Sequence, residues 1–528
     1  MNKMIKWALV LVAVGGAFYF GFNLKEGQST RGVIVTTSDN PLFAGGSETT
    51  LGTTASTGKV IEVRDGENIQ NAVNVANAGD TVAVYPGTYK ETVYVDKDGI
   101  TLSGVIVGGE WPKLDGEGVK NDAILYSGNN VTVENFHISK YKGNGVFGQA
   151  GNNFVIRNNI VDDAGVYGIF PQYGKNGIIS GNVLSNIADA AIYVGMSDNI
   201  DVIANEVFDS VAGIEIENTR HALVEGNYVH DNTGGILVFI MPGLPLKTTY
   251  DVIIRRNFIV NNNHPNFGAP GSAVAGIPAG SGIVIVASDD VVIEDNIITG
   301  NNSYGIGTTD FGFFKSNDKD VEPNPDRLVI LNNVMSNNGE DAAPLIKSLM
   351  ALQMTSKGPD IADSGAGVDK CILNPGQYRT VGLSNYYTCD FASSTSYATR
   401  TMTLSEPAPA FKLEGASAED FERELGRHTY YGICSGCHLD DDVLIGPSVA
   451  EIQDQYLGDL EGMSTADVRE EVDYAAKAIS DYIANPVRVR EHLPPMPTQN
   501  YLSEQTRVAA AKFMLSRNKK LPMLRKEK

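Results

Sequence analysis

The chain has 528 residues, 42% of them hydrophobic, and a formal net charge of −22. This length exceeds one ordinary core and predicts two or three domains, while the apolar content excludes a disordered chain. The charge argues against nucleic-acid binding, because nothing would offset the repulsion of the phosphates.

Residues 1–25 predict a membrane anchor or signal segment. Lys3 and Lys6 precede an apolar run from residue 7 to residue 22, which is the order found in signal peptides. Aromatic residues crowd the end of the run where a cleavage site would lie, so we favour an uncleaved anchor over a cleaved signal. The basic start sends the rest of the chain outward, to the periplasm or cell envelope. Residues 26–58 are rich in Ser, Thr and Gly and predict a flexible linker.

Residues 59–340 repeat two short phrases. In the first, an apolar residue is followed by two variable residues, Asn, one variable residue and another apolar residue, and the first steps are 23, 23 and 22 residues. Its asparagines are Asn159, Asn182, Asn205, Asn227, Asn257, Asn296 and Asn333. The second phrase, a small residue before an apolar one, occurs at Gly145, Gly168, Ala191, Gly213, Gly235, Gly282 and Gly305. Two phrases with one period indicate a solenoid.

A period of about 22 residues supplies three short parallel strands with their turns, one coil per repeat. The repeated Asn suits a tight corner, because it tolerates left-handed backbone and its amide bonds the next coil. Residues 65–105 add an amphipathic helix at 69–76 and a "PGTY" turn. The whole of residues 59–340 resembles the right-handed parallel β-helix proteins of the pectin-lyase-like superfamily. The resemblance implies the fold and leaves lyases, epimerases, hydrolases and non-catalytic binders open.

One face of the solenoid is a candidate site. If Ile214 and Ile216 point inward, Glu215 and Glu217 point outward from the same strand. Stepping by one period predicts two outward columns, which are Phe147, Phe170, Tyr193, Glu215 and Leu237, and beside them Gln149, Gln172, Gly195, Glu217 and Phe239. Rings beside carboxylates and amides fit a glycan, so Phe147, Phe170, Tyr193, Gln149 and Gln172 are the predicted glycan strip.

Catalysis on this face is an alternative to binding. The candidate acid–base residues are Glu215, Glu217, Arg220, His221, His230 and Asp231. No calcium-lyase constellation and no Asp-Pro-His signature of mannuronan epimerases is recognisable. Two structural explanations stay open as well: inserted segments at 241–250, 264–281 and 310–327 cover the face, or Arg220 pairs with one of the two glutamates.

The segment 341–410 is predicted to be irregular and to end in a Pro-containing linker. Cys371 and Cys389 lie 18 positions apart within it. In an exported chain they predict a disulfide, with two buried free thiols as the alternative.

The last domain, residues 411–528, contains the run Cys434-Ser435-Gly436-Cys437-His438. Two thiols at this spacing reach both vinyl groups of one porphyrin and the adjacent histidine meets the iron, so the motif predicts covalently attached haem c. A zinc site would need two further ligands nearby, and a dithiol redox motif would not need the histidine. Met496, between prolines, is the predicted sixth ligand of the iron, and its rivals are Met463, Met514, His428 and His492.

Residues 418–516 resemble class I mono-haem cytochromes c. The resemblance rests on "YYGICSGCH", on Gly446-Pro447, on "AISDYIANP" before the methionine loop, and on a closing helix with Ser503 as its N-cap. It implies a small all-α domain in which the carbonyl of Pro447 holds His438.

Taken together, these features predict an exported c-type cytochrome that exchanges electrons with a periplasmic or membrane redox carrier. Its β-helix would bind a glycan or a partner protein. The alternatives are a polysaccharide lyase, epimerase or hydrolase with an accessory cytochrome, and a non-catalytic scaffold that presents the haem.

Overall fold

The computed structural model describes residues 58–517 except 242–243, 245, 270–271, 315–318, 384, 391–416, 435–437, 439, 441–445, 458–459, 461–462, 488–495, 497–498 and 501. The predicted anchor and the linker after it therefore lie outside the described residues. Within the described residues, no helix has both the length and the apolar character to cross a membrane.

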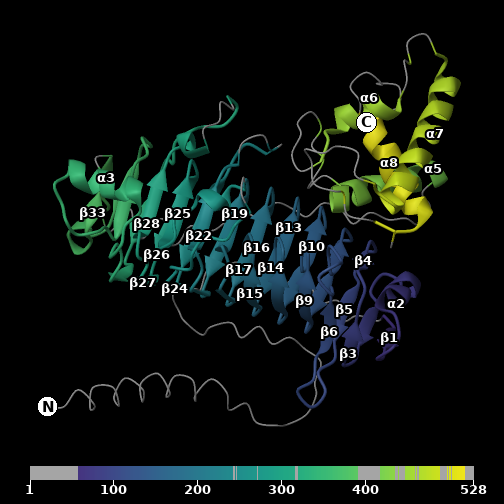
Figure 1. Cartoon of the computed structure of the whole chain (residues 1–528), viewed down its shortest axis with the longest axis horizontal. Coiled ribbons are helices and arrows are strands. Elements are labelled where there is room, and N and C mark those ends of the chain that lie inside the picture. Colours follow the sequence, from purple (N-terminus) through teal and green to yellow (C-terminus); the bar gives the residue numbers. More distant parts are fainter. Residues whose placement is uncertain are drawn as a thin grey trace. The chain divides into compact units, whose positions relative to one another are not determined.

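Three parallel sheets form a right-handed β-helix, as the repeats predict, and their strands stack coil upon coil (Figure 1). Sheet A contains β1 (Val60–Val63), β2 (Thr81–Val84), β5 (Thr101–Gly104), β8 (Thr132–Glu134), β11 (Val155–Arg157), β14 (Lys175–Ser180), β17 (Asp198–Ile203), β20 (Arg220–Glu225), β23 (Tyr250–Arg255), β26 (Asp289–Glu294), β29 (Val329–Leu331), β32 (Lys370–Ile372) and β34 (Tyr386–Thr388). Sheet B contains β3 (Gly87–Tyr89), β6 (Pro112–Asp115), β9 (His137–Tyr141), β12 (Ile160–Ala164), β15 (Val183–Ile187), β18 (Glu206–Phe208), β21 (Tyr228–His230), β24 (Phe258–Val260), β27 (Ile297–Thr299) and β30 (Val334–Ser336). Sheet C contains β4 (Val93–Val95), β7 (Ile124–Tyr126), β10 (Val146–Gln149), β13 (Ile169–Gln172), β16 (Ala190–Gly195), β19 (Ala212–Glu217), β22 (Gly234–Phe239), β25 (Ser281–Val286), β28 (Tyr304–Thr309), β31 (Ile361–Asp363) and β33 (Thr380–Val381).

The interior of the solenoid is a continuous apolar core from Val63 to Tyr378. Alternate side chains of each strand point into it, and equivalent residues of successive coils stack, as Ile192, Ile214 and Ile236 do in sheet C. The predicted helix at the start is α2 (Ile69–Val75), and the side chain of Asn68 caps it by accepting a hydrogen bond from the amide of Asn71.

The repeated asparagines form a hydrogen-bonded ladder at the corner between sheets A and B. The side-chain oxygen of Asn205 accepts bonds from the backbone and side-chain nitrogens of Asn182, at 3.0 Å each, and its own amide donates to Asn227 and to the carbonyl of Ile179. The predicted bonding to the next coil is therefore confirmed. The predicted left-handed backbone is wrong for these asparagines, because the residue before each takes that conformation, for example Ala204 with φ 54°.

The β-helix extends beyond the predicted boundary at residue 340. Strands β31, β32, β33 and β34 add to sheets A and C up to Thr388, after the helix α3 (Pro344–Leu352). Part of the segment that the sequence predicts as irregular is therefore solenoid. The predicted disulfide between Cys371 and Cys389 is confirmed, and it ties β32 to the end of this region.

The C-terminal region is helical. It contains α5 (Ala418–Thr429), a π-helical turn η5 (Tyr430–Cys434), α6 (Val449–Tyr456), α7 (Thr465–Ala484) and α8 (Glu504–Ser516). Ser503 caps α8, as predicted, by accepting a hydrogen bond from the amide of Thr506. Helices α5 and α8 cross closely at Gly426, where an added Cβ would lie 2.1 Å from the carbonyl oxygen of Ala509.

Candidate functional site

The outer face of sheet C carries the two predicted columns in the predicted register. Tyr193 is the Cα partner of Glu215 and Glu215 of Leu237, while Gln149 pairs with Gln172 and Glu217 with Phe239. The alternation that places Ile214 and Ile216 in the interior therefore puts Glu215 and Glu217 on the opposite face.

These columns are not an open strip. Every side chain of the predicted glycan strip is buried, and so are Glu215 and Glu217, which are 1% and 5% exposed. The aromatic members belong to a second apolar cluster that also contains Val274 and Ile277 of one inserted segment, and Phe311 and Val321 of another. Inserted segments therefore cover part of this face, which is one of the alternatives that the sequence leaves open.

Three carboxyl groups and two tyrosines lie together on this face. The hydroxyl of Tyr193 donates a hydrogen bond of 2.5 Å to Oε1 of Glu217, and the ring of Tyr193 stacks on Tyr167 with centroids 4.5 Å apart. Oε1 of Glu215 is buried and has no hydrogen-bond partner among the described residues. Asp189 precedes β16 and interacts electrostatically with both glutamates. We call Asp189, Glu215, Glu217, Tyr167 and Tyr193 the sheet C carboxyl site.

Burial controls the protonation of this site. Loss of water raises the pKa of Glu217 to about 8, against the lowering effect of the bond from Tyr193, and raises the pKa of Asp189 to about 7. Burial, then the charges of Asp189 and Glu217, hold the pKa of Glu215 well above its ordinary value. Burial therefore favours the protonated form of the two glutamates near neutral pH.

The other candidate catalytic residues lie elsewhere. Arg220 opens β20 in sheet A and pairs with Asp198, so the predicted alternative of a pair with Glu215 or Glu217 is wrong. His221 bonds Asp251 at 2.7 Å, and His230, in sheet B, bonds the neighbouring Asp231 at 2.7 Å. These carboxylate partners of Arg220, His221 and His230 lie away from the sheet C carboxyl site. The structure therefore does not bring these three residues, or Asp231, to Glu215 and Glu217.

Sequence reasoning missed Asp189 and Tyr167. Both come just before a strand of sheet C, at positions that step by one period onto Val211 and Ala190, and are half-buried. Their positions in the turns just before strands of sheet C could have indicated them, because a side chain at such a turn can reach the outer face of the neighbouring coil.

A second group of functional candidates surrounds His438 in the helical region. Nδ1 of His438 lies 2.7 Å from the carbonyl oxygen of Pro447, the contact that the resemblance to cytochromes c implies. The ring also packs against Gly446, where an added Cβ would lie 2.4 Å from it. The backbone oxygen of His438 accepts a bond of 3.0 Å from the hydroxyl of Tyr430, and burial lowers the pKa of the imidazole. Burial thus favours the neutral ring, and a hydrogen bond donated by Nδ1 to Pro447 leaves Nε2 as the acceptor nitrogen.

The described residues also place the candidate sixth ligands. Met496 is partly buried against the apolar cluster that includes Tyr430 and Cys434, Met514 packs in the interior of that cluster, and Met463 is exposed. Cys437 and His492 lie outside the described residues, and nothing is described of the side chain of His428. The described positions agree with Met496 as the predicted ligand and do not test it.

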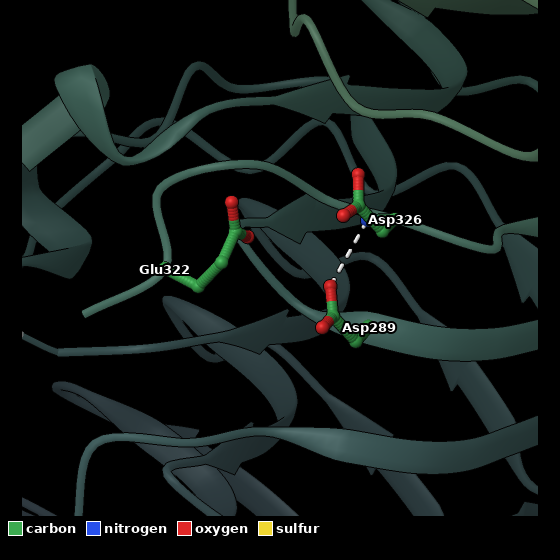
Figure 2. Close-up of side chains that lie close together, drawn as sticks. All are labelled: Asp289, Glu322 and Asp326. Atoms are coloured by element: carbon green, nitrogen blue, oxygen red, sulfur yellow. Dashed lines mark hydrogen bonds between the residues drawn. The ribbon is translucent and has the colours of Figure 1, made fainter.

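Asp289, Glu322 and Asp326 bring three carboxylates within 4.8 Å of one another (Figure 2). Asp289 already accepts 3.0 Å and 2.9 Å bonds from the amide of Asp326 and the guanidinium of Arg327, and Asp326 accepts 2.7 Å from Val368. The glutamate is exposed. Protein partners account for the two aspartates, so we assign no ion to this group.

Two family models match the β-helix. Residues 73–272 match the family described as "Periplasmic copper-binding protein (NosD)", and residues 213–369 match "Right handed beta helix region". Together with the three sheets, these matches define the chain as a right-handed parallel β-helix protein with a helical C-terminal region. No curated protein matches it.

Several solved structures resemble the chain. They include the A-module of mannuronan C-5 epimerase AlgE4 from Azotobacter vinelandii (15% identity, 63% of this chain and 90% of that one, TM-score 0.39), an alginate lyase from Paenibacillus sp. str. FPU-7 (14%, 54% and 99%, 0.37) and DFA-IIIase from Arthrobacter chlorophenolicus A6 (12%, 64% and 98%, 0.40). Likeness at this level says nothing about the chemistry of this chain.

In the part of the chain that the structure describes, Asp289, Glu322 and Asp326 are the sole group of three or more potential metal-binding side chains. Carboxylates are hard ligands that suit Ca²⁺ or Mg²⁺ better than copper.

Proposed function

We propose that this chain is an exported protein of two functional parts: a β-helix that cleaves a polysaccharide by acid–base catalysis, and a C-terminal haem c domain that transfers electrons. Both family models match within the β-helix and support its fold. The proposal of catalysis rests on the sheet C carboxyl site. The periplasmic NosD description supports a periplasmic or cell-envelope location. Anchoring by residues 1–25 belongs to the proposal.

The grouping of Asp189, Glu217 and Tyr193 on one face carries the proposal for the β-helix, and the burial of these groups supports it. A general acid must hold a proton near neutral pH and a general base must lack one. With a pKa raised to about 8, Glu217 meets the first requirement, and Asp189, with a pKa of about 7, can meet the second. Because Glu217 is only 5% exposed, the proposed reaction requires the side chains that cover this face to give way to the substrate. Two carboxyl groups in these roles are the usual machinery of glycoside hydrolysis. Tyr193 would position Glu217 through their 2.5 Å hydrogen bond.

The charges at the site favour a neutral substrate. Lyases and epimerases act on uronates, whose carboxylate needs a cation or strong hydrogen-bond donors. Among the described residues, neither Lys nor Arg forms an ion pair with Asp189, Glu215 or Glu217. An ionised Asp189 would also repel a uronate. Hydrolysis of a neutral glycan is therefore the proposed reaction, and uronate elimination the alternative.

The test is release of new sugar ends from soluble neutral polysaccharides by the full chain. Glu217→Gln keeps the shape of the side chain but cannot give up its proton as an acid, so the rate should fall at least a hundredfold, as expected for loss of a general acid. Glu470→Gln, at an exposed position of α7, is the matched control and should keep the rate. Equal rates for Glu217→Gln and the wild type would refute the role of Glu217. A rise in ultraviolet absorbance from unsaturated ends would support elimination instead.

The geometry at His438 favours the second function. The donor set fits haem c: two cysteines of the motif for the thioether bonds, and His438 and Met496 for the iron. The 2.7 Å contact with Pro447 fixes the ring so that Nε2 can bind the metal, and Gly446 leaves no Cβ to displace it. Haem iron held by His and Met exchanges single electrons at a high potential. A periplasmic or membrane redox carrier is the proposed partner.

The haem proposal is tested on the full chain exported in a host that matures c-type cytochromes. We expect one covalent haem per chain in denaturing gels, and a spectrum with the weak red band of a sulfur ligand. Met496→His should abolish that band and lower the potential, while Met463→Leu, at an exposed site, should change neither. A chain without covalent haem would refute the proposal, and an unaltered band in Met496→His would transfer the ligand role to another residue.

A further inference from the structure

The outer face of sheet B carries exposed apolar side chains on four consecutive coils. Tyr228, Phe258, Ile297 and Val334 open β21, β24, β27 and β30, and each is the Cα partner of the next. Their exposed fractions lie between 37% and 61%. We call these four residues the sheet B strip. The four side chains form one continuous apolar row across adjacent coils, which makes the row a candidate binding surface.

Ring packing holds one end of the strip in place. The imidazole of His230 stacks on Tyr228, with centroids 4.0 Å apart and planes 24° apart, and on Phe208, at 5.1 Å and 10°. Asp231 and Glu206 bond the two nitrogens of His230 at 2.7 Å and 3.3 Å. The aromatic surface is thus fixed before any ligand arrives, which lowers the entropic cost of binding.

The strip alone is too small to hold a second copy of this chain. Four coils about 4.8 Å apart and strands of three residues give an area of roughly 200 Å². A stable protein interface needs about 800 Å² from each partner. The occupant is therefore narrow and elongated.

Charge restricts the occupant further. The acidic side chains of Glu206 and Asp231 border the strip and are 45% and 56% exposed, and the whole chain carries −22. An anionic polymer or an anionic membrane surface would be repelled.

We propose that the sheet B strip binds a neutral β-1,4-linked polysaccharide that lies along the solenoid axis. The pyranose residues of such a chain form a flat ribbon, and their length is close to the coil spacing of about 4.8 Å. The apolar faces of successive sugars would stack on Tyr228 and Phe258 and lie against Ile297 and Val334. The strip goes beyond the proposed hydrolysis, because it is on a different sheet from Glu217 and would hold the polymer without cleaving it.

The test is calorimetric titration of the full, haem-loaded chain with cellohexaose and chitohexaose. Both are measured in the Glu217→Gln background, so that hydrolysis cannot alter the ligand. We expect binding of at least one of them, weakened tenfold or more by Tyr228→Ala with Phe258→Ala. Tyr228→Phe should keep the affinity, because it keeps the ring. Tyr474→Ala, which removes a ring that is 74% exposed on α7, is the matched control and should have no effect.

Three results would overturn the inference: no binding of either hexaose, undiminished binding by the double variant, or an equal loss in Tyr474→Ala. A hexamer of mannuronate is the charge control, and tighter binding of it than of the neutral sugars would also overturn the inference. Failure of the proposed hydrolysis can be told apart from failure of this inference, because a lack of hydrolysis would leave the affinities for the two hexaoses unchanged.

Discussion

Glu217 illustrates how the surroundings of one side chain decide its chemistry. Its outward direction follows from strand alternation and could be predicted from the sequence. Its pKa of about 8 could not, because that value depends on the side chains and inserted segments that remove water from the outer face of sheet C. The raised pKa of Asp189 could not be predicted either, because it interacts with glutamates that come from a neighbouring coil.

The proposed roles of Asp189 and Glu217 predict a bell-shaped pH profile of hydrolysis. The rate should rise as Asp189 loses its proton near pH 7 and fall as Glu217 loses its proton near pH 8. Initial rates between pH 5 and pH 10 measure both limbs. A rate that keeps rising above pH 9 would contradict a protonated Glu217 as the acid.

Stability should depend on pH through the same residue. The pKa of Glu217 is raised from 4.5 in the unfolded chain to about 8 in the folded one, so the folded state binds the proton more tightly. This contribution is complete below pH 4.5, declines as the pH rises and is lost above about 8, with an upper limit of about 5 kcal/mol. The melting temperature of the wild type should therefore fall relative to that of Glu217→Gln between pH 5 and pH 9. Parallel curves for the two proteins would contradict the raised pKa.

At the scale of secondary-structure elements, the sequence predicted part of the hydrogen bonding at the corner between sheets A and B. The period of the asparagines indicated bonds between coils, and the ladder through Asn205 confirms them. A second ladder, from Asn232 through Asn262 and Asn301 to Asn338, was not predicted, because its members lie outside the repeated phrase. The boundary at residue 340 was also wrong, since α3 and the longer loops interrupt the period.

Asn205→Ala tests how much one position of the asparagine ladder contributes to the free energy of unfolding. The change removes the acceptor of two bonds from Asn182 and both donors of Asn205, and leaves buried polar groups unpaired. We expect a loss of about 2–4 kcal/mol in the free energy of unfolding, measured by denaturant titration. Asn74→Ala, at an exposed position of α2, is the control and should cost less than about 0.5 kcal/mol. Equal costs would show that the ladder adds nothing.

The crossing of α5 and α8 depends on the lack of a side chain at Gly426. Gly426→Ala would place a methyl group 2.1 Å from the carbonyl oxygen of Ala509, so the helices must separate. Overpacking of this kind costs about 1–3 kcal/mol, and the thermal transition of the helical region should shift down accordingly. Gly376→Ala adds the same group where no atom lies within 4 Å and should leave that transition unchanged. An unshifted transition in Gly426→Ala would mean that the helices do not cross so closely.

At the scale of the whole molecule, we propose two chemistries for one chain. The repeats predicted the β-helix and the C-x-x-C-H motif predicts the haem, because each is a local signal in the sequence. The sheet C carboxyl site depends on groups from several coils and on the segments that cover them, so the sequence indicated its glutamates but neither their burial nor their partners.

The most direct test of the account is the number of new sugar ends released per haem from a neutral β-linked polysaccharide. The measurement uses the exported full chain and its Glu217→Gln variant, each quantified by its haem absorbance. We predict steady release by the wild type, and at least a hundredfold less by the variant at an identical haem spectrum. Release at the same rate by both proteins, or none by haem-loaded wild type, would contradict it.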